Sequence, residues 1–418
     1  MSLRVGIVSL GCPRNLVDSQ TILSRLKQKG FPIVKLEDAD IVFVNTCAFI
    51  KEAKEESIQT ILELSDLRKK GIIKKLIVCG CLVERYKNKL AKNLDNVDAF
   101  VGRLDLDGGF RPVHLLTPKH FAYVKISEGC GNFCSYCVIP KIKGSLNTRP
   151  IRSIVEEVKA LDKNNIKEIN LVGQDITLYG LDIYGRPMLA ALAREILKNT
   201  RNIKWLRLLY LNPKRIDREL IDLIAKEKRI CKYVDMPIQH INDRILKLMH
   251  RGITRKEILS LIKKLRKAIR NVYLRTSIIV GFPTETDKEF RELLDFLKDV
   301  KFERLGAFIY SREEGTAAYS FKGQVSYLTK KSRLNRIMSL QQENSRQLNE
   351  SLLGKKLEVM VDEKDYEEDN LYLARLEQDA PEVDGTIYVR SSKKLLPGEF
   401  CRIKIIDTLE YDLIGETI

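Results

Sequence analysis

The strongest constraint on the fold is a β/α rhythm that runs from residue 121 to residue 323. Short apolar segments typical of buried parallel strands alternate with longer segments in which apolar residues recur at helical spacing. The strand-like segments are Ala122–Ile126, Glu168–Val172, Trp205–Leu211, Tyr233–Ile238, Val272–Val280 and Arg304–Tyr310, and the helical patterns between them include Ile151–Leu161, Leu189–Leu197, Arg255–Ile269 and Glu289–Leu297. A closed barrel of this kind has eight units. Six units predict an open, partial (β/α)6 barrel over residues 121–323.

A second α/β region precedes the barrel. Its strand-like segments are Arg4–Leu10, Ile41–Asn45 and Leu76–Cys79, and a cysteine follows directly after each one: Cys12, Cys47 and Cys81. Parallel strands end at the same edge of a sheet, so these cysteines are predicted to meet there. From the residues alone they could equally be small buried hydrophobes. We assign 1–102 to an N-terminal parallel-sheet domain and 103–120, which lacks periodicity, to a linker.

The end of the chain changes character again. A polar amphipathic helix is predicted over 324–353, and residues 354–418 contain short alternating strands separated by turn residues. This pattern predicts a small antiparallel β-barrel. The fold class is therefore α/β, with an N-terminal parallel-sheet domain, an open partial barrel and a C-terminal β-barrel.

One cysteine triplet carries the most specific chemistry. Cys130, Cys134 and Cys137 form a C-x3-C-x2-C run directly after the first barrel strand. Thiolates at this spacing suit three irons of a [4Fe-4S] cluster, which leaves the fourth iron open to a substrate or cofactor. The neighbouring glycines argue against a helical stripe of buried cysteines, and a structural zinc site would need a fourth ligand nearby.

On these residues the chain resembles the radical S-adenosylmethionine superfamily, and more closely its methylthiotransferases. The segments that carry the resemblance are LGCPRNLVDSQ, DIVFVNTCAF, CGCLVER and KISEGCGNFCSYCVIPKIKG, and Gly354–Ile418 resembles the TRAM domain of that family. The resemblance implies two [4Fe-4S] clusters. Cys130, Cys134 and Cys137 would hold the cluster that cleaves S-adenosylmethionine to a deoxyadenosyl radical. Cys12, Cys47 and Cys81 would hold an auxiliary cluster that either carries or is sacrificed for the sulfur of the methylthio group. The remaining Cys79, Cys231 and Cys401 are predicted to be packing residues.

Six further residues are candidates for the cofactor pocket, because they follow barrel strands or lie in the triplet: Tyr136, Gln174, Asp175, His240, Gly281 and Glu285. The triplet tyrosine is expected to shield the cluster and to pack near the adenine. The main chain at Gly281 is expected to read the adenine edge, with room for the ring. Alternatively, the segment around Glu285 is an ordinary helix start, and His240 is a structural hydrogen-bonding residue. Arg149 and Arg207 are weaker candidates for contacts with carboxylates.

The charge distribution bears on the partner. The formal net charge is +17, yet residues 354–418 hold 9 Lys/Arg and 16 Asp/Glu, a net of −7. An acidic barrel repels phosphate and attracts a basic protein. Together with LRLLYLNP and DMPIQH, this favours the RimO-like branch of the family, which modifies the β-carbon of an aspartate in protein twelve of the small ribosomal subunit, possibly within the ribosome. The alternatives are a methylthiotransferase acting on a tRNA adenosine and a non-enzymatic iron–sulfur ribosome assembly factor.

Location and electron supply complete the expectations. No apolar run approaches the roughly 20 residues that span a bilayer, and no signal peptide is recognised. We expect a cytoplasmic protein without a membrane partner. The resemblance implies an external low-potential electron donor, either flavodoxin-like or ferredoxin-like.

Overall fold

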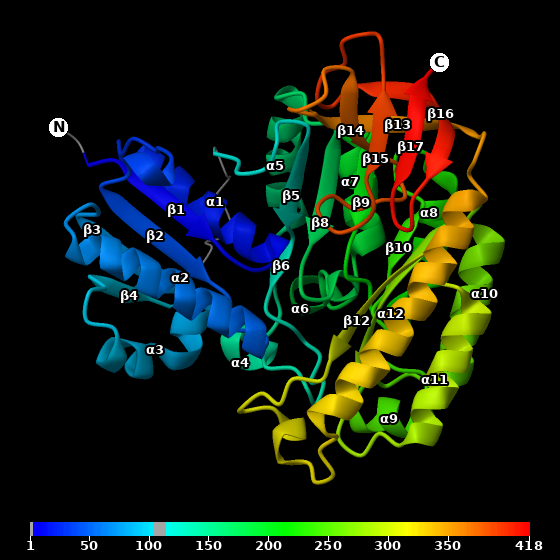
Figure 1. Ribbon diagram of the computed structural model, residues 1–418, viewed down its shortest axis with the longest axis horizontal. Helices are drawn as coiled ribbons and strands as arrows, with labels where there is room; N and C mark the ends of the chain where they lie inside the picture. Colours follow the sequence, from blue (N-terminus) through cyan, green and yellow to red (C-terminus); the bar gives the residue numbers. More distant parts are fainter. Residues whose placement is uncertain (1–2, 103–113) are drawn as a thin grey trace.

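The computed structural model describes residues 3–102 and 114–418, so most of the expected linker lies outside the described residues. The N-terminal domain is a parallel sheet in the order β1 (Val5–Ser9), β2 (Ile41–Thr46), β3 (Lys75–Gly80) and β4 (Ala99–Val101). Helices α1 (Pro13–Gln28), α2 (Lys51–Lys69) and α3 (Cys81–Asn93) connect and cover the strands (Figure 1). The three expected strands are present, and the short β4 is an addition.

The middle of the chain forms two three-stranded parallel sheets. One contains β5 (Phe121–Lys125), β8 (Glu168–Val172) and β9 (Trp205–Leu208), and the other contains β10 (Tyr233–Asp235), β11 (Tyr273–Val280) and β12 (Arg304–Ile309). A parallel bridge between Leu206 and Ile230 joins them. Six parallel strands therefore follow one another in chain order, as expected for an open partial barrel.

Two of these strands end earlier than expected. The backbone of Tyr210 lies in the left-handed region, at φ 65°, and its N–H donates to the side chain of Asp235 at 2.9 Å instead of a neighbouring strand. A non-glycine residue in this conformation is uncommon and leaves the ladder. β9 consequently stops at Leu208, and the segment that follows is free to shape the mouth of the barrel.

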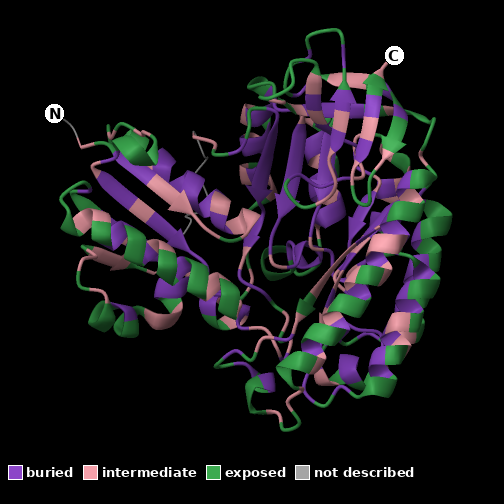
Figure 2. Ribbon diagram, in the orientation of Figure 1, coloured by how far each residue is buried: buried purple, intermediate pink, exposed green. Residues whose placement is uncertain are grey.

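Helices cover the outer face of the two sheets, and Figure 2 shows buried strands between half-exposed helices. The longer ones are α5 (Ile151–Lys163), α7 (Leu189–Lys198), α8 (Arg218–Lys226), α10 (Arg255–Ala268) and α11 (Asp287–Val300). Capping boxes begin α10 at Thr254 and α11 at Thr286. Short elements follow the carboxyl-terminal ends of the barrel strands, which form the mouth of the barrel: β6 (Ser127–Glu128), β7 (Asn147–Thr148), α4 (Ile139–Lys143), α6 (Leu181–Tyr184) and α9 (Asp243–Leu248).

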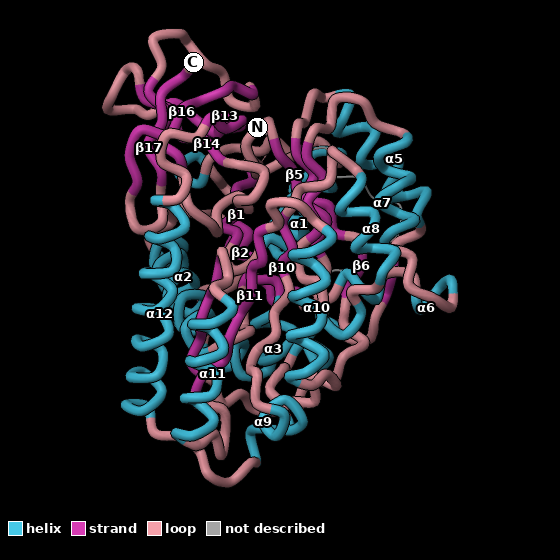
Figure 3. Tube along the Cα trace, turned by 90° about the vertical axis from the view of Figure 1, so that its right-hand side faces the viewer, coloured by secondary structure: helices cyan, strands magenta, loops and turns pink. Residues whose placement is uncertain are grey.

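The long helix α12 (Tyr327–Glu350) runs along the barrel and leads into the C-terminal module (Figure 3). The strands of this module are β13 (Lys356–Lys364), β14 (Leu371–Arg375), β15 (Ile387–Arg390), β16 (Phe400–Thr408) and β17 (Leu413–Thr417). They close in the order β13-β14-β15-β17-β16, and β15 pairs with β17 in parallel. The expectation of an all-antiparallel barrel is therefore wrong in this detail. A closed ring of five strands cannot alternate in direction throughout, so one neighbouring pair must be parallel.

Buried ion pairs attach this module to the amino-terminal ends of the barrel strands. Arg207 and Arg375 both contact the carboxylate of Glu168, at 2.8 Å and 2.7 Å, and Arg304 contacts Asp379 at 2.6 Å. Arg207 and Glu168 are fully buried. The carboxylate contact expected for Arg207 is thus an internal one at a domain junction. Arg149 likewise pairs internally, with Glu157 at 2.6 Å.

Candidate active site

The N-terminal cysteines lie at one edge of their sheet. Cys12 and Cys81 stand at the starts of α1 and α3, and Cys47 follows β2. Gly11, at φ +87°, allows Cys12 and Cys47 to approach each other, because a Cβ on this residue would lie 2.9 Å from the sulfur of Cys47. The thiols of Cys12 and Cys47 both act electrostatically on Cys81. The three cysteines therefore meet in space, as the strand pattern predicts.

Basic side chains reach into this set of thiols. Burial raises the pKa of Cys47, and it raises the pKa of Cys81 to about 12 against the opposing charge of Lys143. At Cys12 burial also acts to raise the pKa, but the guanidinium of Arg14 and neighbouring backbone N–H groups outweigh it, so the pKa is lowered. Positive charge therefore favours the anionic, metal-binding form at Cys12, whereas at Cys47 and Cys81 it only offsets part of the effect of burial.

The second set of cysteines occupies the loop between β6 and α4. The backbone N–H of Asn132 donates to the sulfur of Cys130 at 3.4 Å, and Arg251 donates to the sulfur of Cys134 at 3.6 Å. Burial raises the pKa of Cys130, and it raises that of Cys137 to about 12. The loop is therefore tightly folded and bears two donors aimed at its sulfur atoms.

Asp175 holds this loop in place. Its carboxylate accepts hydrogen bonds from Asn132 at 2.7 Å and from Arg215 at 3.0 Å, and it also accepts the backbone N–H of Thr177 at 3.0 Å. Arg215 in turn donates to the side-chain oxygen of Asn132 at 2.7 Å. The neighbouring Gln174 is half-buried. Asp175 thus positions the cysteine loop through other side chains.

Tyr136 packs beside the loop. It is half-buried and lies against the apolar cluster that includes Met249, Phe282 and Tyr310. Burial raises the pKa of its hydroxyl, which interacts with the thiols of Cys134 and Cys137. Tyr136 thus lies between the cysteine loop and the segment after β11.

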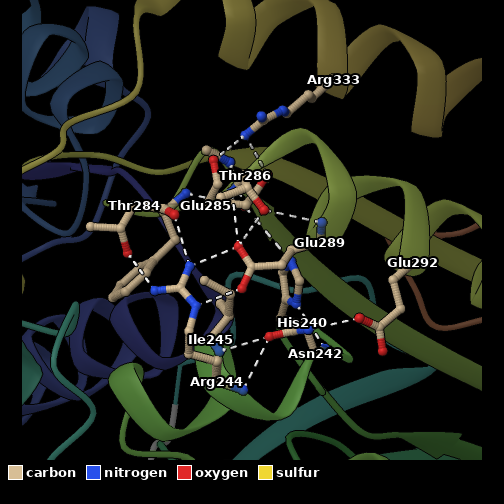
Figure 4. Close-up of polar contacts among 12 residues, drawn as sticks. His240, Asn242, Arg244, Ile245, Thr284, Glu285, Thr286, Glu289, Glu292 and Arg333 are labelled. Carbon is tan, nitrogen blue, oxygen red and sulfur yellow. Dashed lines mark hydrogen bonds and ion pairs between the residues drawn. The ribbon is translucent and has the colours of Figure 1, made fainter.

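His240 and Glu285 face each other inside the protein (Figure 4). The ring Nε2 of His240 lies 3.7 Å from the Glu285 carboxylate, and both side chains are fully buried. Glu285 also accepts the N–H of Gly281 at 2.9 Å and pairs with Arg333 of α12 at 2.7 Å. Burial lowers the pKa of His240 to about 3 and raises that of Glu285 to about 7 against the charge of Arg333. These contacts brace the turn after β11.

The structure supplies a packing reason for the glycine in that turn. Gly281 has φ +70°, and a Cβ on it would lie 2.3 Å from the Cγ of Lys330 on α12. The amine of Lys330 donates a hydrogen bond to the carbonyl oxygen of Tyr310 at 3.0 Å. The side of Gly281 on which room for an adenine ring was expected is therefore occupied by a lysine side chain.

Two sets of salt bridges fix the N-terminal domain against the barrel. Asp18 of α1 contacts both Lys125 of β5 and Lys143 of α4, the latter at 3.0 Å, and Glu128 contacts the same two lysines at 2.5 Å and 3.1 Å. On the other side, the buried Glu313 binds Lys54 of α2 and Arg85 of α3, each at 2.7 Å. The cysteine edge of the N-terminal sheet consequently faces the mouth of the barrel.

The donor set suits iron–sulfur clusters. Each set offers three thiols, and thiolates are the preferred ligands of such clusters. Within residues 3–102 and 114–418, no group of three or more His, Cys, Asp or Glu side chains is arranged around a single metal ion. A cubane distributes its ligands over different irons, so it does not need three sulfur atoms that converge on one ion. The buried, unpartnered polar atoms nearby include the Oγ of Ser127 and the Nε of Arg251, as expected beside a group that they would bind.

Sequence reasoning missed Arg14, Asn132, Arg215 and Arg251. In a chain with 73 lysines and arginines, no single basic residue gives a signal. Asn132, inside the triplet itself, had the best chance of being found. Of the other cysteines, Cys79 and Cys231 are buried and Cys401 is half-buried, in keeping with a packing role.

Comparison with known proteins identifies the class. Residues 124–297 match the model of the Radical SAM superfamily, residues 4–102 match Uncharacterized protein family UPF0004, and residues 353–418 match the TRAM domain. The protein is thus a radical S-adenosylmethionine enzyme, and that superfamily uses a [4Fe-4S] cluster and S-adenosylmethionine.

Full-length relatives define the family further. The chain is 45% identical to the ribosomal protein uS12 methylthiotransferase RimO of Caldicellulosiruptor saccharolyticus, over 100% of both chains. It is 44% identical to that of Pelotomaculum thermopropionicum, again over 100% of both, and 41% identical to that of Clostridioides difficile, over 100% and 99%. The chain belongs to the RimO family of ribosomal protein uS12 methylthiotransferases.

Solved structures agree on the fold alone. The radical S-adenosylmethionine methyltransferase TsrM from Kitasatospora setae aligns with a TM-score of 0.53 at 16% identity, covering 76% of this chain and 77% of that one. No helix of the described residues is long and apolar enough to cross a membrane.

Proposed function

We propose that this protein adds a methylthio group to the β-carbon of an aspartate in ribosomal protein uS12. The observation that carries the proposal is the gathering of six cysteines in two sets of three, with the charge of Arg14 acting on a thiol of each set. The sets are Cys12, Cys47 and Cys81 at the edge of the N-terminal sheet, and Cys130, Cys134 and Cys137 at the mouth of the barrel. The full-length family membership supports the same reading. The alternatives, tRNA modification and a non-enzymatic assembly role, become outcomes of the experiment below.

In this proposal each set of cysteines holds one [4Fe-4S] cluster. The bound clusters and S-adenosylmethionine supply the radical and sulfur chemistry, with electrons from an external flavodoxin- or ferredoxin-like donor. The protein's own residues position that chemistry. Asp175 and Arg215 fix the triplet loop through Asn132, while Arg251 and Arg14 place positive charge against the sulfur atoms.

The pocket residues contribute in two ways. Tyr136 excludes water from one side of the triplet loop. His240, Gly281 and Glu285 shape the turn after β11, whose outer backbone remains the part suited to bind the nucleotide. Gln174 follows β8 by two residues at the same mouth and is half-buried.

The acidic barrel gives the proposal its partner. Several of its carboxylates, among them Asp362, Asp379 and Asp384, are used internally against Arg375, Arg304 and Arg275. The densest run of acids facing solvent lies at the end of β13 and in the turn between β13 and β14, and we call it the acidic turn: Glu363, Asp365, Glu367, Glu368 and Asp369. This turn lies on the module at the amino-terminal ends of the barrel strands. It would hold basic uS12 at a contact remote from the modified aspartate.

The test is a parallel anaerobic assay. The reconstituted enzyme is incubated with S-adenosylmethionine and reductant, and with either small-subunit ribosomal proteins or tRNA, and mass spectrometry then searches for an added methylthio group. A gain on a uS12 aspartate supports the proposal. A gain on tRNA adenosine refutes the choice of substrate, and no product from an enzyme with both clusters intact favours the assembly role.

Single cysteine variants separate the two sets. Replacing Cys130, Cys134 or Cys137 by alanine is expected to abolish formation of 5′-deoxyadenosine. Replacing Cys12, Cys47 or Cys81 should spare that cleavage and end sulfur insertion. Identical behaviour of all six variants would show that the proposed division between the sets is wrong.

A further inference from the structure

One arginine reaches from the N-terminal domain into the mouth of the barrel. The Nη1 of Arg14 donates to the carbonyl oxygen of Gly173, at the end of β8, with a distance of 3.0 Å. Its guanidinium stacks on the ring of Tyr210, just beyond β9, at 4.4 Å from the ring centroid. Arg14 follows Cys12 by two residues, and its charge acts on the thiols of both Cys12 and Cys137. It therefore stands between the two cysteine sets.

The charge of Arg14 is met by the Cys12 thiol, the Tyr210 ring and the more distant Glu128, but by no ion-paired carboxylate in the described part of the chain. No carboxylate of the described residues lies within ion-pair distance of the guanidinium, and its Nε is buried without a hydrogen-bond partner. A buried, unpartnered charge-bearing donor is costly. Five other cations around the mouth are paired with carboxylates: Lys125 and Lys143 with Asp18, Arg149 with Glu157, Arg215 with Asp175, and Arg275 with Asp235.

Arg251 is the nearest comparison. It too lacks a carboxylate among the described residues, but it is directed at Cys134 and at the carbonyl oxygen of Pro237, so it belongs to the triplet side alone. Only Arg14, of these two, lies between the sets. Under the proposed function, a substrate carbon is activated at one set of cysteines and receives sulfur from the other. That carbon would therefore be bound between the two sets, where Arg14 lies.

Two local features at Arg14 are unfavourable unless they serve a function. A cation in the first turn of α1 opposes the helix dipole, and that turn carries no acidic residue. Its stacking partner Tyr210 has a left-handed backbone at φ 65°, a strained state for a bulky residue. Such breaches of local preference concentrate at functional sites.

We propose that Arg14 binds the carboxylate of the substrate aspartate and thereby selects aspartate at the reacting position. The inference rests on the proposed function, because it assumes that the substrate is a protein aspartate. A guanidinium suits this role, since its planar set of N–H donors can grip a carboxylate in two places and hold the adjacent β-carbon in a fixed direction. The neutral amide of asparagine offers only one acceptor oxygen and no charge.

The test measures binding without turnover. Holoenzyme with S-adenosylmethionine and no reductant is titrated with a fluorescent uS12 peptide that contains the modified aspartate, and with the same peptide carrying asparagine. The wild type is expected to bind the aspartate peptide roughly tenfold to a hundredfold more tightly. Arg14→Gln should bind the two peptides within about twofold of each other, and Arg14→Lys should lie between. Arg218→Gln, which removes an exposed arginine of α8, serves as the matched control and should keep the wild-type ratio.

The outcomes separate the possible failures. An unchanged ratio in Arg14→Gln overturns the inference, and so does a wild-type ratio of one. If Arg14→Gln does not retain iron, the same titration is made with the iron-loaded Arg14→Lys variant. A wild-type ratio of the two peptide affinities in that variant, together with a reduced iron content, would assign Arg14 to the thiols and not to the substrate. A wild type that modifies no uS12 peptide under reducing conditions refutes the proposed function itself.

Discussion

The buried ion cluster between the N-terminal domain and the barrel supports a quantitative prediction. Its members are Asp18, Lys125, Glu128 and Lys143, and their side chains are between 4% and 18% exposed. Asp18→Asn removes one of two carboxylates and leaves two buried ammonium groups to share Glu128. Removing one partner of a buried ion pair costs about 3–5 kcal/mol, because the remaining charge stays desolvated.

The assay is thermal and urea unfolding of the full chain at neutral pH. At roughly 2–4 °C per kcal/mol for a folding unit of about 150–250 residues, the unfolding midpoint should fall by about 6–20 °C. Asp222→Asn is the matched control, since it breaks an exposed pair with Arg218 at 3.7 Å and should cost less than about 0.5 kcal/mol. If Asp18→Asn costs no more than this control, the cluster does not hold the two domains together.

Three further predictions concern the barrel mouth. Gly281→Ala should destabilise the protein in urea unfolding by about 1–3 kcal/mol more than Gly30→Ala, because both glycines have positive φ but only Gly281 faces a side chain, Lys330, at 2.3 Å. The pKa of His240 is lowered from 6.5 to about 3, so below pH 6.5 the unfolded chain takes up a proton that the folded chain excludes. The contribution of His240 to stability should therefore fall by about 1.4 kcal/mol per pH unit between pH 6.5 and 3, and His240→Gln should remove this contribution while leaving the opposing one of Glu285, whose pKa is raised to about 7. Asp175→Asn should speed the loss of cluster iron to a chelator by roughly tenfold, since it weakens the hold on the triplet loop.

Each of these has a result that would contradict it. Equal losses for the two glycine variants would mean that Lys330 moves aside without cost. An unchanged pH slope in His240→Gln would assign the acid sensitivity to other groups. Wild-type iron retention in Asp175→Asn would show that the triplet loop holds its shape without the carboxylate.

Local patterns predicted much of the site. The apolar strand segments and the residues that end them are encoded within a few positions, so the placement of Cys12, Cys47 and Cys81 at one sheet edge followed from strand ends alone. The six barrel strands followed in the same way. The short strand β4 at the edge of the N-terminal sheet could not be predicted, because three residues with partial burial give too weak a periodicity.

Contacts between distant segments were beyond such patterns. Lys330 fills the space beside Gly281 from a helix about 50 residues further along the chain. The local sequence of neither segment predicts this contact. Arg14 carried no signal among 73 basic residues until its neighbours were known. The parallel β15–β17 pair depends on the number of strands in the closed ring, which the sequence left uncertain.

The ion pairs beneath the C-terminal barrel bear on how this domain can be inherited. Glu168, Arg207 and Arg304 on the side of the large barrel pair with one another and with Arg375 and Asp379 of the C-terminal module. A barrel transplanted onto an unrelated enzyme would carry unmatched carboxylates, and the enzyme that lost it would present bare guanidinium groups. A change of charge on one side of this junction is therefore expected to need a matching change on the other.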